Sequence, residues 1–460
     1  MRSDVRQHEF DPHRGMPWLP WWYRPSRMFL GASLPALLIF SFSDSTLTLS
    51  RAPLFYGPRD LVVGLIALVM LIAGAFLGES RLLASVWGAI TGRGRGPRHR
   101  SAATTGPAPR LAEALLSEQV DRWLLVVFLV AHVIFFRNFI TSPGLIAGVL
   151  GGNVELKHTF KTIPGVTTWT QVSLVLGALR GLRWSGILPG RIKLISLFHL
   201  AFFGTLFVRA ILWSERLAMI EGAVPFFVCA LPRVCAQAGP FWRLFLRLFP
   251  FIVPIMLLVV FTAFESLRSW GYYSSQYSSV FEFGWRRLYT YYFEAMNTGA
   301  AALGAGGFYD GPTGFLTHDG YESIYQGLYQ GTLDLEYNNV SGLWYVALRM
   351  GNLLFGPVFF LVGVYFGLTW RGFVAGRLTG LLYPITFLGL MEVIRIPYWA
   401  GLPRVLPTTV VIIGILIWGA SLPYRMRKRR LAPDPIGGAG AVALPPAALA
   451  TGSHQYLRPR

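Results

Sequence analysis

Two uncharged stretches decide the fold of this chain: Trp123-Leu-Leu-Val-Val-Phe-Leu-Val-Ala131 and Val410-Val-Ile-Ile-Gly-Ile-Leu-Ile-Trp418. Each lies within a longer apolar segment, and a helix needs about 20 mostly apolar residues to cross the hydrocarbon core of a bilayer. Of all 460 residues, 53% are hydrophobic and only 14% are charged, whereas a soluble domain carries roughly 25% charged residues. The composition therefore predicts an all-α, polytopic membrane protein.

Further segments share this apolar character, which predicts about ten transmembrane helices. They lie at residues 28–45, 61–78, 122–141, 166–182, 194–212, 217–232, 248–267, 351–370, 379–394 and 407–422. Only a short break near Trp213-Ser214 separates the fifth segment from the sixth. A single bent helix across that break would leave nine spans and move the basic cluster Arg425–Arg430 to the other side of the membrane.

Basic residues predict the orientation of the chain. Cytoplasmic loops of membrane proteins are enriched in Lys and Arg, and the basic residues here concentrate on one side when the N-terminus is placed inside. Both termini are then cytoplasmic, and the net charge of +19 is explained without nucleic acid as a partner. The predicted organisation is a cytoplasmic N-terminal segment (1–27), a transmembrane domain (28–424) with a flexible cytoplasmic loop at 92–110, and a basic, then disordered, cytoplasmic tail (425–460).

The largest external segment, residues 268–350, lies between predicted spans seven and eight and is rich in Tyr, Trp, Asn and Gln. Its start, 280–301, is predicted to form an amphipathic helix. Aromatic faces stack on pyranose rings and side-chain amides bond sugar hydroxyls, which suggests carbohydrate recognition. Asn338 and Asn339, in the run Glu336-Tyr-Asn-Asn339, are the candidate sugar contacts, because an aromatic belt at the membrane interface does not explain that run.

Charged residues gather at two outer junctions between predicted spans. The junction of spans five and six carries Arg209, Glu215, Arg216 and Glu221. The junction of spans nine and ten carries Glu392, Arg395 and Arg404, and Tyr398 lies between them in the sequence. Charged groups at membrane depth cost roughly 2.5–3.5 kcal/mol each on insertion scales, so they are usually paired or functional. Guanidinium groups bind phosphate oxygens bidentately, which points to a lipid-linked diphosphate. The alternative is a set of internal ion pairs that lock helices together, Arg209 with Glu215 and Glu392 with Arg395.

The segment that opens the fourth predicted span, Ile163-Pro-Gly-Val-Thr-Thr-Trp-Thr-Gln171, carries three further candidates. Its Pro-Gly pair favours a turn, and Thr167 or Thr168 is predicted to cap the helix that follows. Because a helix N-terminus attracts anions, Thr167, Thr168 and Gln171 are also candidate contacts to phosphate or sugar.

A general base for such a site would be a carboxylate or an imidazole whose pKa suits proton transfer. The candidates are Glu215, Glu221, Glu392 and His318, although each carboxylate could instead serve only in an ion pair. Cys229 and Cys235 lack the spacing of a metal site, and the first external loop (44–60) contains no paired carboxylates. The sequence therefore predicts neither a metal nor a cofactor.

Four stretches of the chain together resemble bacterial oligosaccharide repeat-unit polymerases, the Wzy-type family of O-antigen polymerases. They are Ile163-Pro-Gly-Val-Thr-Thr-Trp-Thr-Gln171, Arg209-Ala-Ile-Leu-Trp-Ser-Glu-Arg-Leu-Ala-Met-Ile-Glu221, Glu336-Tyr-Asn-Asn-Val-Ser-Gly342, and Glu392-Val-Ile-Arg-Ile-Pro-Tyr398 followed by Arg404-Val-Leu-Pro407. Each motif alone has low specificity. Their order, with a large external loop before the last three spans, is what carries the resemblance.

The resemblance implies a fold similar to the GT-C and O-antigen-ligase-like transferases, in the bacterial cytoplasmic (inner) membrane. The implied reaction moves a growing glycan from undecaprenyl diphosphate onto a new lipid-linked repeat unit at the periplasmic face. Implied partners are the undecaprenyl-diphosphate-linked oligosaccharide, membrane lipid, a chain-length regulator and a flippase.

The resemblance also implies roles for the charged residues. Four arginines would hold the diphosphates and stabilise the leaving group as its charge develops: Arg209, Arg216, Arg395 and Arg404. Glu215 or Glu221 would orient these arginines or deprotonate the acceptor hydroxyl. Asn338 and Asn339 would contact sugar.

Three other functions stay open at this point. An O-antigen ligase would deliver finished polymer to a different acceptor, and another polyprenyl-linked glycosyltransferase would carry an acidic metal motif in its first external loop. A transporter or flippase for the same lipid-linked sugar would place charged residues along a path at mid-membrane. In this sequence the charges cluster near the outer face instead, which favours a reaction at the surface.

Overall fold

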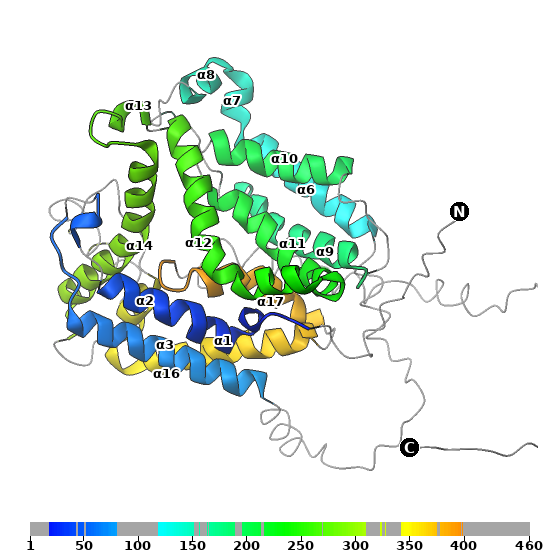
Figure 1. The fold of residues 1–460 in the computed structure, drawn as a ribbon. Helices are drawn as coiled ribbons and strands as arrows, with labels where there is room; N and C mark the ends of the chain where they lie inside the picture. The colour runs from blue at the N-terminus through cyan, green and yellow to red at the C-terminus, as the bar shows by residue number, and fades with distance from the viewer. Residues whose placement is uncertain are drawn as a thin grey trace, which may run out of the picture.

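In the computed structural model, the described part of the chain is helical and contains no strand (Figure 1). It comprises residues 18–42, 45–49, 52–80, 118–150, 156, 163, 165–188, 196–212, 216–268, 270–309, 323, 327, 342–374, 378–396 and 398. The all-α fold class is confirmed for these residues. The predicted cytoplasmic loop at 92–110, the tenth span at 407–422 and the tail at 425–460 lie outside them.

This part of the chain forms α-helices, together with a few short 3-10 helices and one π-helix. The α-helices are α1 (Pro25–Met28), α2 (Leu34–Ser41), α3 (Pro58–Glu79), α6 (Glu118–Phe135), α7 (Arg137–Thr141), α8 (Gly144–Leu150), α9 (Ser173–Ser185), α10 (Leu197–Leu212), α11 (Arg216–Gln237), α12 (Pro240–Arg268), α13 (Trp270–Tyr273), α14 (Val280–Ala305), α16 (Gly342–Val374) and α17 (Leu382–Met391). The 3-10 helices are η1 (Trp21–Tyr23), η3 (Ser45–Leu47), η5 (Thr167–Val172) and η6 (Leu378–Leu381), and η2 (Phe29–Ser33) is a π-helix.

Four helices in this part of the chain are long and apolar enough to cross a membrane: α3, α11, α12 and α16. They coincide with predicted spans two, six, seven and eight. Shorter helices occupy the other predicted spans within the described residues, among them the apolar α10 and α17. The structure thus supports the membrane character of the chain, while the full number of spans stays a prediction.

The external segment between spans seven and eight contains the helix α14 and the first turns of α16. The helix predicted over 280–301 is present as α14, which packs against α12 and α16. α16 begins at Gly342, earlier than the predicted span at 351–370, and its helical geometry is interrupted at Gly351, where φ is 71°. Glycine reaches this left-handed region without steric cost, so the apolar run is extended outward by a second helical piece joined through a kink.

Close backbone contacts fix the direction of α3 relative to α16. A side chain at Gly74 would collide with the carbonyl of Phe360, and one at Gly78 would collide with that of Val364. Because both pairs advance by four residues in the same sense, the two helices run parallel, and Figure 1 shows them side by side. Small residues let helix backbones approach in this way in membranes.

The same reasoning shows that predicted spans five and six are two helices. Leu206 and Phe202 of α10 lie against Gly222 of α11, while Phe203 contacts Phe226, one turn farther along α11. The contacting residue numbers decrease along α10 as they increase along α11, so the two helices form an antiparallel hairpin. The alternative of one bent helix across Trp213-Ser214 is therefore contradicted.

Contacts between the ends of helices define two opposite ends of the bundle, which we call basal and apical. At the basal end, Ser26 donates to the Glu79 carboxylate from its backbone N–H (2.8 Å) and its hydroxyl (2.9 Å), and Arg371 donates to the Ser80 carbonyl (2.8 Å). At the apical end, Trp344 donates its indole N–H to the Asp60 carbonyl (3.0 Å). α3 and α16 therefore both run from the apical end to the basal end.

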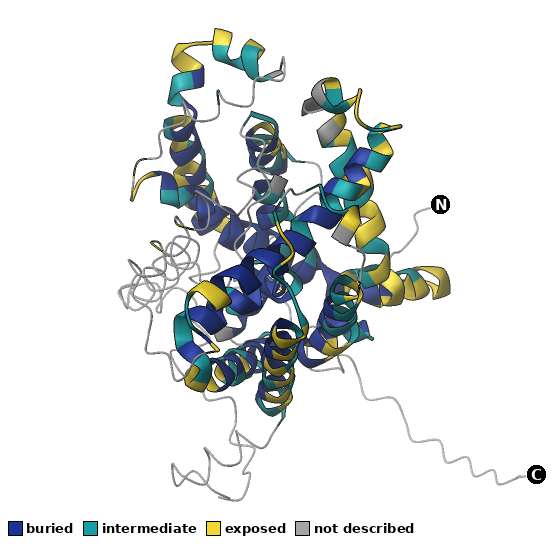
Figure 2. Ribbon diagram, turned by 90° about the vertical axis from the view of Figure 1, so that its left-hand side faces the viewer, coloured by how far each residue is buried: buried dark blue, intermediate teal, exposed yellow. Residues whose placement is uncertain are grey.

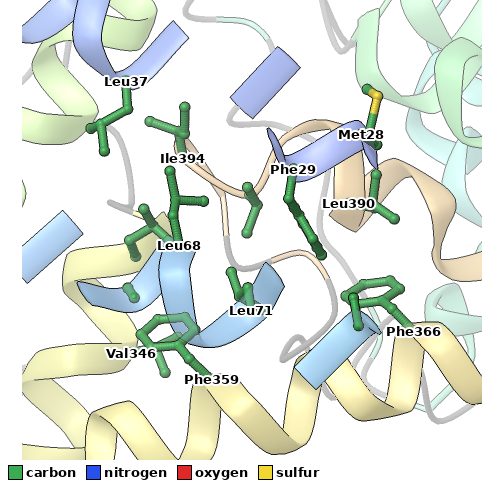
Figure 3. Packing of buried hydrophobic residues seen from close by; sticks show 14 of the residues in the cluster. Met28, Phe29, Leu37, Leu68, Leu71, Val346, Phe359, Phe366, Leu390 and Ile394 are labelled. Carbon is green, nitrogen blue, oxygen red and sulfur yellow. The ribbon is translucent and has the colours of Figure 1, made fainter. Parts of the chain in front are cut away.

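A hydrophobic core joins the N-terminal helices to α3, α16 and α17. Figure 3 shows Phe29, Leu71 and Phe366 pointing toward one another from three of these elements. From Trp18 onward, the predicted N-terminal segment belongs to this core, since Trp22 and Tyr23 are almost fully buried. Buried residues lie on the inward faces of the helices and exposed residues on the outward faces (Figure 2).

The contact between α3 and α16 gives the first testable prediction. Gly74→Leu should lower the free energy of unfolding by about 1–3 kcal/mol, because the two backbones have no space for a side chain there. Unfolding can be followed by maleimide labelling of Cys229 and Cys235, which are both buried. Gly304→Leu is the matched control, because a side chain at Gly304 would meet no atom within 4 Å; equal destabilisation by both changes would contradict the close contact.

Candidate functional site

The turn that follows α17 carries the best-defined part of the site, at the apical end. In this turn the backbone N–H of Ile396 donates to the carbonyl of Glu392 (2.8 Å). The start of α16 holds the turn in place, because the N–H of Gly342 donates to the carbonyl of Ile394 (3.1 Å). Gly342 has no room for a side chain here, so the turn and α16 are in direct backbone contact.

Four side chains on this turn and on α14 form the Glu392 cluster: Glu392, Arg395, Tyr291 and Tyr292. Nη1 of Arg395 lies 3.6 Å from Oε2 of Glu392, and the hydroxyl of Tyr292 donates to Oε1 of Glu392 at 3.1 Å. The Arg395 guanidinium carbon lies 5.0 Å and 5.9 Å from the ring centroids of Tyr291 and Tyr292. Ring faces attract a cation at these distances, so α14 fixes both charged groups of the turn.

The Glu392 cluster keeps hydrogen-bonding capacity for a ligand. Oε2 of Glu392 and Nε of Arg395 are buried and have no hydrogen-bond partner among the described residues, although the two groups form an ion pair. Burial raises the pKa of Tyr292 well above its ordinary value, and the Glu392 charge raises it further. Tyr292 therefore stays protonated and continues to donate to Glu392.

Tyr398 connects this turn to α11. Its hydroxyl donates to Oε1 of Glu221 at 2.5 Å, and both residues are almost fully buried. Glu221 comes from the predicted junction of spans five and six, whereas Tyr398 and Glu392 come from that of spans nine and ten. The structure therefore brings together two junctions that the sequence could only identify separately.

Arg209 lies near the end of α10 and is buried. Its guanidinium carbon lies 5.0 Å from the ring centroid of Phe135 on α6. One turn earlier, Leu206 packs against Gly222, the residue after Glu221. Arg209 and Glu221 therefore lie at similar heights along the axes of the two antiparallel helices α10 and α11.

The predicted capping role of Thr167 and Thr168 is wrong. Val166 is the residue that precedes η5, no side chain caps that helix, and α9 begins only at Ser173. The Thr167 hydroxyl donates to the carbonyl of Ile163 (3.0 Å). Threonine forms such bonds to the residue four positions earlier, and Thr167 is itself the first residue of η5 and not the residue before it. Contact of Thr167 or Thr168 with phosphate or sugar stays a prediction.

Gln171 is buried, and its Oε1 has no hydrogen-bond partner among the described residues. α9 runs parallel to α11, because side chains at Gly177 and Gly181 would collide with the carbonyls of Gly222 and Phe226. Extended by two turns, this register places Gln171 level with Arg216, the first residue of α11. Gln171 thus lies at the apical end, where the sequence places the charged junction.

The other predicted site residues lie outside the part of the chain that the structure describes. They are Glu215, Asn338, Asn339, Arg404 and the candidate base His318. For Arg216 only the backbone is described, as the start of α11. The roles of these residues stay predictions.

Sequence reasoning missed a buried ionic cluster at the basal end, the Asp121 cluster, formed by Asp121, Arg180, Arg183 and His199. Asp121 accepts from Arg183 Nε (2.6 Å) and Nη2 (3.2 Å) and from Arg180 Nη1 (3.4 Å), and all three side chains are at most 4% exposed. His199 Nε2 accepts from Arg180 Nε at 3.4 Å. The signal in the sequence was the spacing of Arg180 and Arg183, one turn apart at the end of a predicted span.

Metal ligation receives no support from this part of the chain. No three His, Cys, Asp or Glu side chains lie close enough together among the described residues to hold a metal ion. Metal-independent activity stays a prediction.

The chain was compared with known protein families, with curated proteins and with solved structures, and none of them matches it. The resemblance of the four stretches to repeat-unit polymerases therefore stays a prediction.

Proposed function

We propose that this protein is a metal-independent glycosyltransferase that polymerises undecaprenyl-diphosphate-linked oligosaccharide repeat units into O-antigen or exopolysaccharide. The observation that carries the proposal is the meeting of both charged junctions at the apical end, through the Glu392 cluster and the contact of Tyr398 with Glu221. Arginines and carboxylates at one end of an apolar bundle suit a substrate whose tail lies in the membrane and whose diphosphate and sugars lie at its surface.

The proposed reaction needs a cation and a base. A hydroxyl of the new lipid-linked unit attacks the anomeric carbon of the growing chain, and the bond from that carbon to the diphosphate oxygen breaks. Undecaprenyl diphosphate leaves with the bonding electrons, and its charge is stabilised by Arg395 and Arg209, with Arg216 and Arg404 in supporting roles. Glu392 accepts the proton of the hydroxyl, because its Oε2 is buried and has no hydrogen-bond partner among the described residues.

The hydroxyl of Tyr292 gives a testable prediction about this base. Tyr292→Phe should lower polymer formation by about tenfold, because Glu392 loses the donor that orients it, while the ring under Arg395 remains. The measurement is the initial rate of chain elongation with purified protein in lipid discs. Tyr56→Phe removes a comparable hydroxyl contact, to Ser41 (2.8 Å), outside the cluster and should elongate at the wild-type rate. A full rate for Tyr292→Phe would exclude this orienting role.

The proposal places the protein in the bacterial inner membrane, with the apical end at the periplasmic face and both termini in the cytoplasm. The positive-inside rule supports this orientation, because Arg24, Arg233 and Arg371 lie at the basal end. Ser275, an exposed residue between α13 and α14, tests it. Ser275→Cys should react with a membrane-impermeant maleimide in intact cells, against a low background because Cys229 and Cys235 are buried. Labelling only after the cells are broken open would reverse the orientation.

The alternatives differ in the acceptor that they use. The purified protein should be given a labelled undecaprenyl-diphosphate repeat unit, first alone and then with a lipid-A-type acceptor. A polymerase elongates the unit without the second acceptor, and elongation should survive chelation of metal ions. Transfer only to the lipid-A-type acceptor would identify a ligase. No covalent product in either reaction, with translocation of the lipid across the membrane, would identify a transporter.

A further inference from the structure

A lateral apolar pocket of about 510 Å³ lies between α6, α7, α8 and α10. Its volume falls within the roughly 300–1,000 Å³ that small-molecule sites occupy. Val133, Ile140, Leu200 and Val208 line the pocket and are between 44% and 70% exposed. The pocket is therefore open toward the outward face of the bundle, where a membrane protein meets the hydrocarbon of the bilayer.

The wall of this pocket carries one buried polar atom that the bundle leaves without a partner. His132 is 1% exposed, its Nδ1 donates to the carbonyl of Phe128 (2.9 Å), and its Nε2 has no hydrogen-bond partner among the described residues. The ring of Phe135 adjoins both His132, at 6.5 Å between ring centroids, and the guanidinium of Arg209, at 5.0 Å. An apolar chamber thus lies beside a cation and a buried imidazole.

We propose that this pocket binds the isoprenoid chain of the undecaprenyl diphosphate substrate, with the diphosphate next to Arg209 and His132. The inference rests on the proposed function, to which it adds the place of the lipid. A bulky, methyl-branched hydrocarbon fills the apolar chamber from the bilayer side, and the diphosphate pairs with the guanidinium. Because Nδ1 carries the proton that is donated to Phe128, Nε2 of His132 is an acceptor, which suits a hydroxyl of the sugar attached to the diphosphate.

Photolabelling tests the pocket without relying on enzymatic turnover. The probe is undecaprenyl diphosphate with a diazirine in its isoprenoid chain, added to the full-length protein in lipid discs. We expect labelled peptides from residues 118–150 and 196–212. Unlabelled undecaprenyl diphosphate should suppress this labelling, and an equal amount of phosphatidylglycerol should not.

Filling the pocket supplies the variant. A side chain at Gly204, on the pocket wall, would meet no atom within 4 Å, so Gly204→Phe occupies the space and should reduce labelling by about tenfold. Gly239→Phe places the same side chain in open space away from the pocket, after α11, and should label as the wild type does. The thermal unfolding of each variant is measured first. If Gly204→Phe is unstable, Val208→Trp at the open rim of the pocket is used in its place.

Three results would overturn the proposal: labelling confined to other segments, unchanged labelling in the pocket-filling variant, or equal competition by phosphatidylglycerol. The third would show a general site for membrane lipid. Chain elongation is measured on the same samples. Pocket labelling without elongation would support the lipid site and reject the polymerase, so the two proposals can fail separately.

Discussion

Replacing Asp121 with alanine is expected to lower the free energy of unfolding by about 3–5 kcal/mol. Arg180 and Arg183 are at most 4% exposed, and Asp121 is the carboxylate that both of them contact. Without it, two guanidinium groups stay buried and lose their counterion, which costs far more than the pair itself contributes. The measurement is denaturant-induced unfolding in detergent, and the extent of unfolding is monitored by the reaction of Cys229 and Cys235 with maleimide.

Glu118→Ala is the matched control, because it removes a carboxylate from the same helix. Glu118 pairs with Arg122 at 3.3 Å, but the two side chains are 54% and 71% exposed. Exposed pairs are screened by solvent and contribute little, so this variant should unfold like the wild type. Equal stability of Asp121→Ala and Glu118→Ala would contradict a buried ionic cluster that holds α6, α9 and α10 together.

Replacing Arg395 with alanine is expected to lower the rate of chain elongation by about 10²–10³, the loss seen when one group that stabilises developing negative charge is removed. Its guanidinium pairs with Glu392 and lies over Tyr291 and Tyr292, so its direction is fixed before the substrate binds. Arg395→Lys should also elongate poorly, because an ammonium group is a point charge that lacks the planar fork needed for bidentate contact with a diphosphate.

Arg286→Ala controls for the general loss of a positive charge at the apical end. Arg286 pairs with Glu282 on α14 at 3.1 Å, and both side chains are about one-third exposed. It lies outside the Glu392 cluster and should elongate at the wild-type rate. Protein amount in the membrane and thermal stability are measured for all variants. Full activity of a stable Arg395→Ala would remove Arg395 from the reaction.

Apolar runs made the membrane helices predictable, because length and hydropathy are local properties of a sequence. The pairing of those helices was not predictable, since it depends on where backbones can approach. Gly74 and Gly222 mark two such contacts, but glycines at other positions, such as Gly304, meet nothing. The early start of α16 was missed because Arg349 and the aromatic residues near it lower the hydropathy of its first turns.

The charged junctions of the site were predictable from residues that oppose the expected charge distribution. Arg395 and Glu392 are three residues apart, which made their ion pair a reasonable alternative. Tyr292 was recognised only as one aromatic residue among many, because its contact with Glu392 spans 100 residues of sequence. The capping prediction for Thr167 failed because a 3-10 helix intervenes before α9, which local residue preferences did not show.

Polymerisation can be measured by incubating the purified protein in lipid discs with one labelled undecaprenyl-diphosphate repeat unit and separating the products by size. We expect a ladder of products spaced by one repeat unit from the wild type and from Arg286→Ala, and only the starting unit from Arg395→Ala. No ladder from the wild type, with its own repeat unit supplied, would contradict the proposed polymerase.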